Sequence, residues 1–195
     1  MRLYFDNFLP QELFYELNKR MLWRFGSTRR WDHATEINET QAVRFRTKTD
    51  NHDYTEAACI LGAMVPNCVN HIRNHLITNL QFQEPEAHYI WFQYMNMKQT
   101  VGKHLDGISR NRKAYQCFRG FLYTHSEWED NWGGELCIGP NENDEEAINI
   151  LPKPNRLIVY SVDQTHWVKP VRHGRSDYQR MFLGTSWTTF NTEAL

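Results

Sequence analysis

A chain of 195 residues, 41% of them hydrophobic, has the length of one domain and can bury a core. Its formal net charge of −1 argues against a nucleic-acid partner, which usually requires a basic face. No apolar run approaches the roughly 20 residues of a membrane span, the N-terminus lacks the apolar segment of a signal peptide, and the four cysteines form no CxxC pair, so we expect a cytoplasmic monomer with reduced thiols.

The N-terminal part of the chain has helical periodicity. Residues 10–25 predict an amphipathic helix, because Pro10 suits a first helical turn and apolar residues follow at Leu13, Phe14, Leu17 and Met21. Asp53 and Glu56 have the spacing of a capping box and predict the start of a second helix. Pro66 is expected to kink or split this helix, whose apolar face comprises Leu61, Val65, Cys68, Ile72 and Leu76.

The rest of the chain predicts short strands. Residues 29–49 are polar, with one strand expected at 42–47, and from His88 the apolar period changes from helical to two. The strands expected from there on are 88–97, 101–106, 115–124, 135–138, 147–151, 156–161, 165–171 and 179–190.

Helices followed by about eight strands favour a mainly β fold, a jelly roll flanked by two or three helices on one outer face. We expect a single domain over residues 1–195. Residues 1–85 would supply helical support and substrate loops, and residues 86–195 would form the jelly-roll core.

A candidate metal site lies near the middle of the sequence. His104 and Asp106 are separated by one residue, and side chains at this spacing leave the same face of an extended strand. With His166 as the third ligand they would form a 2-His-1-carboxylate triad, which holds Fe(II) and leaves coordination positions open. The alternative for the pair is a half-exposed strand with two polar residues, and His125 and His173 are weaker candidates for the third ligand.

Further motifs follow in a specific order. Trp132-Gly133-Gly134 lies between the two halves of the triad, His166 precedes Trp-Val-Lys-Pro-Val, and an apolar strand that begins at Arg180 follows. Over roughly residues 88–190 the chain resembles the 2-oxoglutarate/Fe(II)-dependent dioxygenases, most closely the prolyl 4-hydroxylase-like branch. This resemblance implies a cupin-like double-stranded β-helix, Fe(II), 2-oxoglutarate as co-substrate, O2, and ascorbate as a candidate reductant.

The resemblance also implies roles for individual residues. An arginine at the start of the last core strand would bind the far carboxylate of 2-oxoglutarate, and Arg180 is preferred over Arg175, which has nearly the usual distance from His166. Tyr123 would share that carboxylate. Tyr94 and Trp187 are candidate substrate-binding residues, with core aromatics as the alternative for the two tyrosines.

The activity implied is hydroxylation of a prolyl residue in a protein or peptide, with release of succinate and CO2. Alternatives are a free amino acid, an alkylated nucleic acid, or a non-catalytic jelly-roll binding protein. Demethylation of nucleic acid is disfavoured, because the Asn-x-Tyr expected before the His-x-Asp motif is absent: Met97 and Lys98 follow Asn96. Residues 29–49 and 107–113 are expected to form loops that cover the site and determine specificity.

Overall fold

The computed structural model describes residues 2–26, 43–46, 64–83, 87–95, 100–106, 114–139, 146–172 and 180–190. Its α-helices are α1 (Gln11–Gly26) and α3 (Met64–Asn74), which runs into a π-helical turn at His75–Asn79. A 3-10 turn lies at Asp130–Trp132. The strands are β1 (Arg2–Phe5), β2 (Val43–Arg46), β3 (Ala87–Met95), β4 (Val101–His104), β5 (Ala114–Tyr123), β6 (Leu136–Gly139), β7 (Ile148–Ile150), β8 (Leu157–Ser161), β9 (Thr165–Val168) and β10 (Arg180–Phe190).

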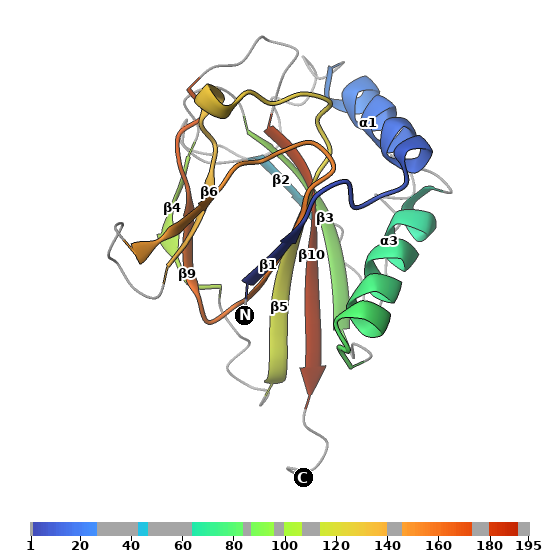
Figure 1. The fold of residues 1–195 in the computed structure, drawn as a ribbon, viewed down its shortest axis with the longest axis vertical. Helices are drawn as coiled ribbons and strands as arrows, with labels where there is room; N and C mark the ends of the chain where they lie inside the picture. Colours follow the sequence, from blue (N-terminus) through green and yellow to red (C-terminus); the bar gives the residue numbers. More distant parts are fainter. Residues whose placement is uncertain are drawn as a thin grey trace.

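The strands form two antiparallel sheets that face each other, as Figure 1 shows. One sheet has the order β1-β8-β5-β10-β3-β2, and the other has the order β4-β9-β6-β7. From β3 to β10 the chain places strands in both sheets, and the four-stranded portion β8-β5-β10-β3 lies opposite β4-β9-β6-β7. This arrangement is that of a double-stranded β-helix, so the expected mainly β fold is confirmed, with β1 and β2 added at the edges of the larger sheet.

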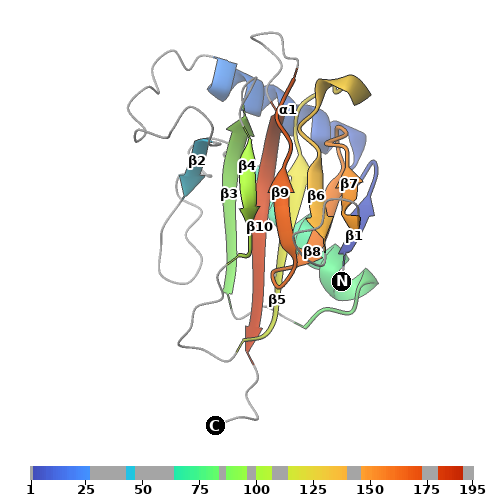
Figure 2. The same cartoon turned by 90° about the vertical axis from the view of Figure 1, so that its left-hand side faces the viewer.

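The larger sheet separates two buried clusters, because successive side chains on a strand point to opposite faces. The cluster between the sheets contains Phe121, Tyr123 and Phe182 together with residues of β6, β7, β8 and β9. The cluster on the outer face contains Leu122, Leu183 and apolar residues of both α-helices. The helices therefore cover one face of the larger sheet and leave its other face to the space between the sheets (Figures 1 and 2).

The helix predicted at 10–25 and the apolar face predicted for the second helix agree with the structure, whereas the kink or split expected at Pro66 stays a prediction. α1 matches the helix expected at 10–25, and Leu17 and Met21 are fully buried. The predicted apolar face of the second helix is buried at Cys68 and Ile72 of α3 and at Leu76 of the π-helical turn that follows. Pro66 is the third residue of α3, in the first turn, where a missing backbone N–H breaks no helical hydrogen bond. The proposed capping box at Asp53 and Glu56 lies outside the described residues.

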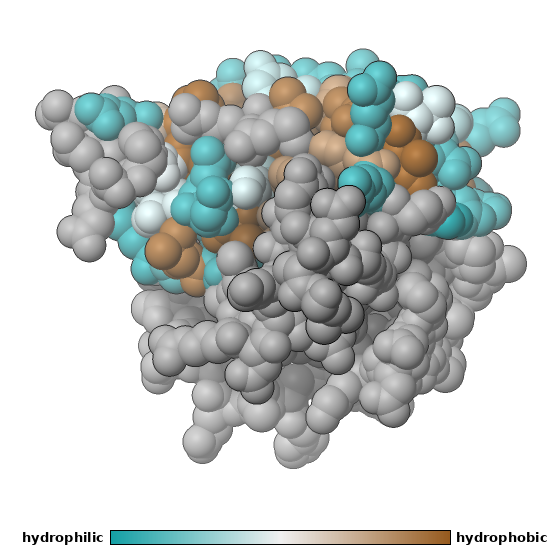
Figure 3. All heavy atoms as spheres, turned by 90° about the horizontal axis from the view of Figure 1, so that it is seen from below, coloured by the Kyte–Doolittle hydropathy of each residue, from teal (hydrophilic) through white to brown (hydrophobic). Residues whose placement is uncertain are grey.

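The helices, the surface and the cysteines of the described residues add three observations. Among the described helices, none is long and apolar enough to cross a membrane. On the face shown in Figure 3, hydrophobic and hydrophilic residues are interspersed over the described part of the chain. Cys68, Cys117 and Cys137 form no disulfide bond within the described part of the chain, and Cys59 lies outside it.

Candidate active site

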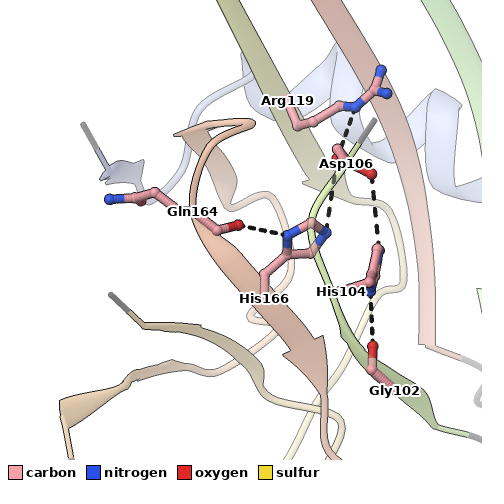
Figure 4. A network of polar contacts seen from close by, with 6 residues as sticks. All are labelled: Gly102, His104, Asp106, Arg119, Gln164 and His166. Carbon is pink, nitrogen blue, oxygen red and sulfur yellow. Dashed lines mark hydrogen bonds and ion pairs between the residues drawn. The ribbon is translucent and has the colours of Figure 1, made fainter. Parts of the chain in front are cut away.

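Three potential metal ligands converge on one edge of the four-stranded sheet (Figure 4). His104 ends β4, Asp106 lies two residues beyond it, and His166 lies in β9 directly opposite His104 in the strand register. One ligand atom from each residue lies within 4.8 Å of the others. The strand ends at His104 instead of reaching Asp106 as predicted, yet the structure still brings the three side chains together.

The hydrogen bonds of the two histidines determine which ring nitrogen of each carries a proton. Nδ1 of His104 lies 2.8 Å from the carbonyl oxygen of Gly102, and Nδ1 of His166 lies 3.1 Å from that of Gln164. A carbonyl can only accept, so both Nδ1 atoms carry a proton, and in a neutral imidazole this leaves the lone pair on Nε2.

These lone pairs point toward a carboxylate. Nε2 of His104 lies 3.8 Å from Oδ1 of Asp106, and Nε2 of His166 lies 3.8 Å from Oδ2. Burial lowers the pKa of His166 by more than the nearby Asp106 carboxylate raises it, which keeps the imidazole neutral, as a metal ligand must be. The two Nε2 atoms and the carboxylate are electron-rich and share no hydrogen bond, so a cation between them would stabilise the group. Two imidazoles and one carboxylate are a ligand set that suits Fe(II). The residues present therefore fit this metal.

A fourth residue that the sequence analysis missed joins this group. Arg119, on β5 of the opposite sheet, donates from Nε to Oδ2 of Asp106 at 2.9 Å. A signal for it was present in the sequence, because Arg119 has the same period-two phase as Phe121 and Tyr123, which face the space between the sheets.

A buried cation lies in the same interior, at the start of β10. Arg180 is 0% exposed and donates from Nε to the carbonyl oxygen of Gly134 at 2.7 Å and from Nη2 to the hydroxyl of Tyr123 at 2.8 Å. Its Nη1 meets only the weakly accepting Sδ of Met95, at 3.3 Å. Among the described residues no carboxylate contacts this guanidinium. A buried charge without a counter-ion is costly, so the position favours an anionic ligand.

Tyr123 is suited to share such a ligand. The ring is fully buried, and burial raises the pKa of its hydroxyl against the opposing effect of Arg180. The hydroxyl therefore keeps its proton, accepts from Arg180, and can donate to a carboxylate oxygen. A dicarboxylate such as 2-oxoglutarate fits a site that pairs a metal centre with this cation and this donor.

The turn at Gly133-Gly134 lies beside Arg180. Both glycines have positive φ, 76° and 71°. A Cβ at Gly134 would lie 3.0 Å from Cδ of Arg180 and 3.2 Å from the ring of Trp128. The turn therefore needs glycine for its backbone conformation and for space beside the arginine that its carbonyl holds.

Other predicted site residues have different positions. Trp187 is 1% exposed in the cluster between the larger sheet and the helices, and its indole N–H donates to the carbonyl oxygen of Gln83. It stands seven residues after Arg180 on the same strand, and an odd spacing places two side chains on opposite faces. The structure therefore corrects the substrate-binding role predicted for Trp187. Tyr94 pairs with Met181 in the register of β3 and β10, and its substrate-binding role stays a prediction.

The rivals considered for these roles are either structural or outside the described residues. His125 is buried and hydrogen-bonded at both ring nitrogens, through Nε2 to the carbonyl oxygen of Pro152 and through Nδ1 to the backbone N–H of Met181. Burial lowers its pKa to about 4, so it is a neutral core histidine. His173 and Arg175 lie outside the described residues.

Comparison with solved structures gives the same fold. A prolyl-4-hydroxylase from Pseudomonas putida matches with a TM-score of 0.62 and 17% identity, covering 97% of this chain and 92% of that one. A prolyl hydroxylase from Trichoplax adhaerens, solved with a peptide fragment of the hypoxia inducible factor oxygen degradation domain, matches with a TM-score of 0.67 and 19% identity over 98% and 84% of the two chains. A viral collagen prolyl hydroxylase from Paramecium Bursaria Chlorella virus-1, solved as a 2OG complex, matches with a TM-score of 0.59 and 12% identity over 96% and 94%.

At these identities the structural likeness establishes the fold alone, and a comparison with curated proteins gives no match. The family is established by sequence. The model of the 2OG-Fe(II) oxygenase superfamily matches residues 90–188, just over half of the chain, and this range contains the three candidate ligands, Tyr123 and Arg180. The chain therefore belongs to the 2OG-Fe(II) oxygenase superfamily.

Proposed function

We propose that this oxygenase hydroxylates a prolyl residue in a protein or peptide and releases succinate and CO2. The observation that carries the proposal is the buried guanidinium of Arg180, which no carboxylate of the described residues contacts, in the interior that also contains Nε2 of His104 and of His166. The ring of Tyr160 connects the two parts, because it packs 4.8 Å from the ring of His166 and belongs to the same buried cluster as Tyr123.

Each part of the site has a distinct task in this proposal. His104, Asp106 and His166 hold Fe(II), and Arg180 with Tyr123 binds the far carboxylate of 2-oxoglutarate. When bound, the metal and the ketoacid supply reductive activation of O2 for attack on an unactivated C–H bond, chemistry that no side chain provides. The buried rings of Phe121 and Phe182 line the interior and exclude water from the bound co-substrate.

The choice of a prolyl substrate rests on the structural neighbours. The three described above are prolyl hydroxylases, and the one from Trichoplax adhaerens is solved with a peptide. The loops expected to recognise the substrate, 29–49 and 107–113, lie outside the described residues except for β2. A free amino acid, an alkylated nucleic acid and a purely binding role remain as the competing outcomes of the test.

The test is a turnover assay with Fe(II), 2-oxoglutarate, ascorbate and a panel of proline-rich peptides. We expect succinate release that depends on peptide, and a gain in peptide mass of one oxygen that disappears when the target proline is replaced by alanine. Succinate release with amino acids or methylated oligonucleotides, and none with peptides, would redirect the proposal to those substrates. No succinate under any condition, with metal still bound, would support the non-catalytic alternative.

A further inference from the structure

The contact between Arg119 and Asp106 joins the two sheets next to the candidate metal ligands. Arg119 lies on β5, opposite Ser186 of β10 and Tyr160 of β8 in the strand register, whereas Asp106 follows β4 of the smaller sheet. The Nε–H of Arg119 meets Oδ2 at 2.9 Å, with side-chain exposures of 23% for the arginine and 18% for the aspartate. The pair is thus half-buried and points into the space between the sheets (Figure 4).

The geometry shows why Asp106 needs a partner. It lies beyond the last residue of β4, so the strand ladder does not hold its backbone as it holds those of His104 and His166. Each histidine is oriented by a hydrogen bond from Nδ1 to a backbone carbonyl. The corresponding bond for the carboxylate is the one from Arg119.

We propose that Arg119 is a positioning residue of the candidate metal centre, which holds Oδ2 of Asp106 so that the carboxylate stays turned toward His104 and His166. This inference rests on the proposed function, in which these three residues bind the metal. Groups that hydrogen-bond a metal ligand orient it before the metal arrives, and their loss typically lowers metal affinity about 10- to 100-fold.

Two other effects of Arg119 have to be weighed. As an ion pair at a partly exposed position, it contributes little to the stability of the fold. As a positive charge near a cation, it also opposes metal binding, but solvent and salt weaken that repulsion at a position that is 23% exposed. The orienting hydrogen bond and the charge therefore have opposite effects on metal affinity, and a pair of substitutions can separate them.

The experiment compares Arg119→Met with Arg119→Gln in Mn(II) binding, read from the electron paramagnetic resonance signal of free Mn(II). Both side chains reach the point that Nε occupies, Met with a methyl group and Gln with an amide N–H donor. We expect Arg119→Met to weaken Mn(II) binding about 10- to 100-fold. Arg119→Gln should stay within about threefold of the wild type, because it retains an N–H donor at the same place.

Arg156→Met is the matched control. Arg156 pairs with Asp6 through Nε and Nη2, the latter at 2.8 Å, and neither residue contacts the three ligands. We expect this variant to bind Mn(II) as the wild type does.

Each outcome bears on one hypothesis. Unchanged or tighter binding in Arg119→Met would overturn the positioning role. Equal losses in the Met and Gln variants would also overturn it, because they would show that an N–H donor at this place does not preserve metal affinity. If Arg119→Met does not fold by circular dichroism, Arg119→Ala replaces it at this partly exposed position. Failure of the wild-type protein to bind Mn(II) would instead count against the proposed function.

Discussion

Arg180 and His125 are buried polar side chains that lie near the same part of the chain. His125 accepts a hydrogen bond from the backbone N–H of Met181, the residue after Arg180. The two side chains differ in charge and in hydrogen-bond partners. His125 is neutral and finds partners at both ring nitrogens. Arg180 is a cation whose hydrogen-bond partners among the described residues are a carbonyl, a hydroxyl and a thioether. One residue has the environment of a structural group and the other has that of a binding group.

Substitution of Arg180 is expected to change the affinity for 2-oxoglutarate and to leave the metal affinity unchanged. Replacing Arg180 by Met removes the partner of a buried carboxylate, a loss of roughly 3–5 kcal/mol. The KM for 2-oxoglutarate should rise several hundred-fold or more, while Mn(II) affinity stays near the wild-type value because no ligand is touched. Arg175→Ala is the control and should leave the KM nearly unchanged. The reverse pattern would make Arg175 the anchor.

The histidine predicts a pH-dependent stability. Below about pH 6.5 the unfolded chain binds a proton at His125, whereas the folded chain does so only near pH 4. The unfolded state thus binds more protons, and stability falls by about 1.4 kcal/mol per pH unit as pH drops through this window. His125→Gln should be less stable at pH 7 but should lose about 2 kcal/mol less than the wild type between pH 7 and pH 5. Urea unfolding at the two pH values measures this difference, and parallel losses would exclude His125 as the cause.

At the scale of elements, the change to a period of two after residue 87 and the turn residues between the segments located the eight strands from β3 to β10 to within a few residues. β1 was missed, since four residues offer little alternation and its partner β8 lies more than 150 residues away. The pairing of His104 with Asp106 followed from their spacing, and the choice of His166 followed from the resemblance to the dioxygenase family. The strand phase of Arg119 indicates that it faces the space between the sheets, but its contact with Asp106 could not be predicted, because that contact depends on how the two sheets face each other. The substrate-binding role predicted for Trp187 is wrong because the odd spacing from Arg180 places Trp187 on the opposite face of the strand.

The turn at Gly133-Gly134 gives a prediction for an element. Gly134→Ala places a side chain in a left-handed conformation, at a cost of about 1–2 kcal/mol, and forces the new Cβ toward Cδ of Arg180. We expect lower stability and a higher KM for 2-oxoglutarate, with Mn(II) affinity retained. Gly102→Ala is the control, since a Cβ there would meet nothing within 4 Å. Equal effects of the two substitutions on KM would show that the turn does not support the arginine.

At the scale of the whole molecule, the two halves of the site belong to different sheets. The three ligands come from the edge of the four-stranded sheet, and Arg180 and Tyr123 come from the six-stranded sheet. A metal and a dicarboxylate bound together would therefore connect the sheets, so each should bind more tightly in the presence of the other.

Thermal unfolding without O2 tests this coupling. The rise in Tm with Mn(II) and 2-oxoglutarate together should exceed the sum of the rises with each alone, since each ligand stabilises the form that the other binds. In Arg180→Met, 2-oxoglutarate should add little to the effect of Mn(II). Additive shifts in the wild type would mean that the sheets bind the two ligands independently.

The central position of β10 in the larger sheet also determines when this sheet can form during synthesis of the chain. β10 pairs with β5 on one side and β3 on the other, although both precede it by many residues. During synthesis, a chain that ends before residue 180 contains all three candidate ligands but leaves the facing edges of β3 and β5 unpaired, a form prone to aggregate. Folding must wait for these distant contacts and should be slow. The strand that closes the sheet begins with Arg180, so the finished fold and the ability to hold the co-substrate arrive together.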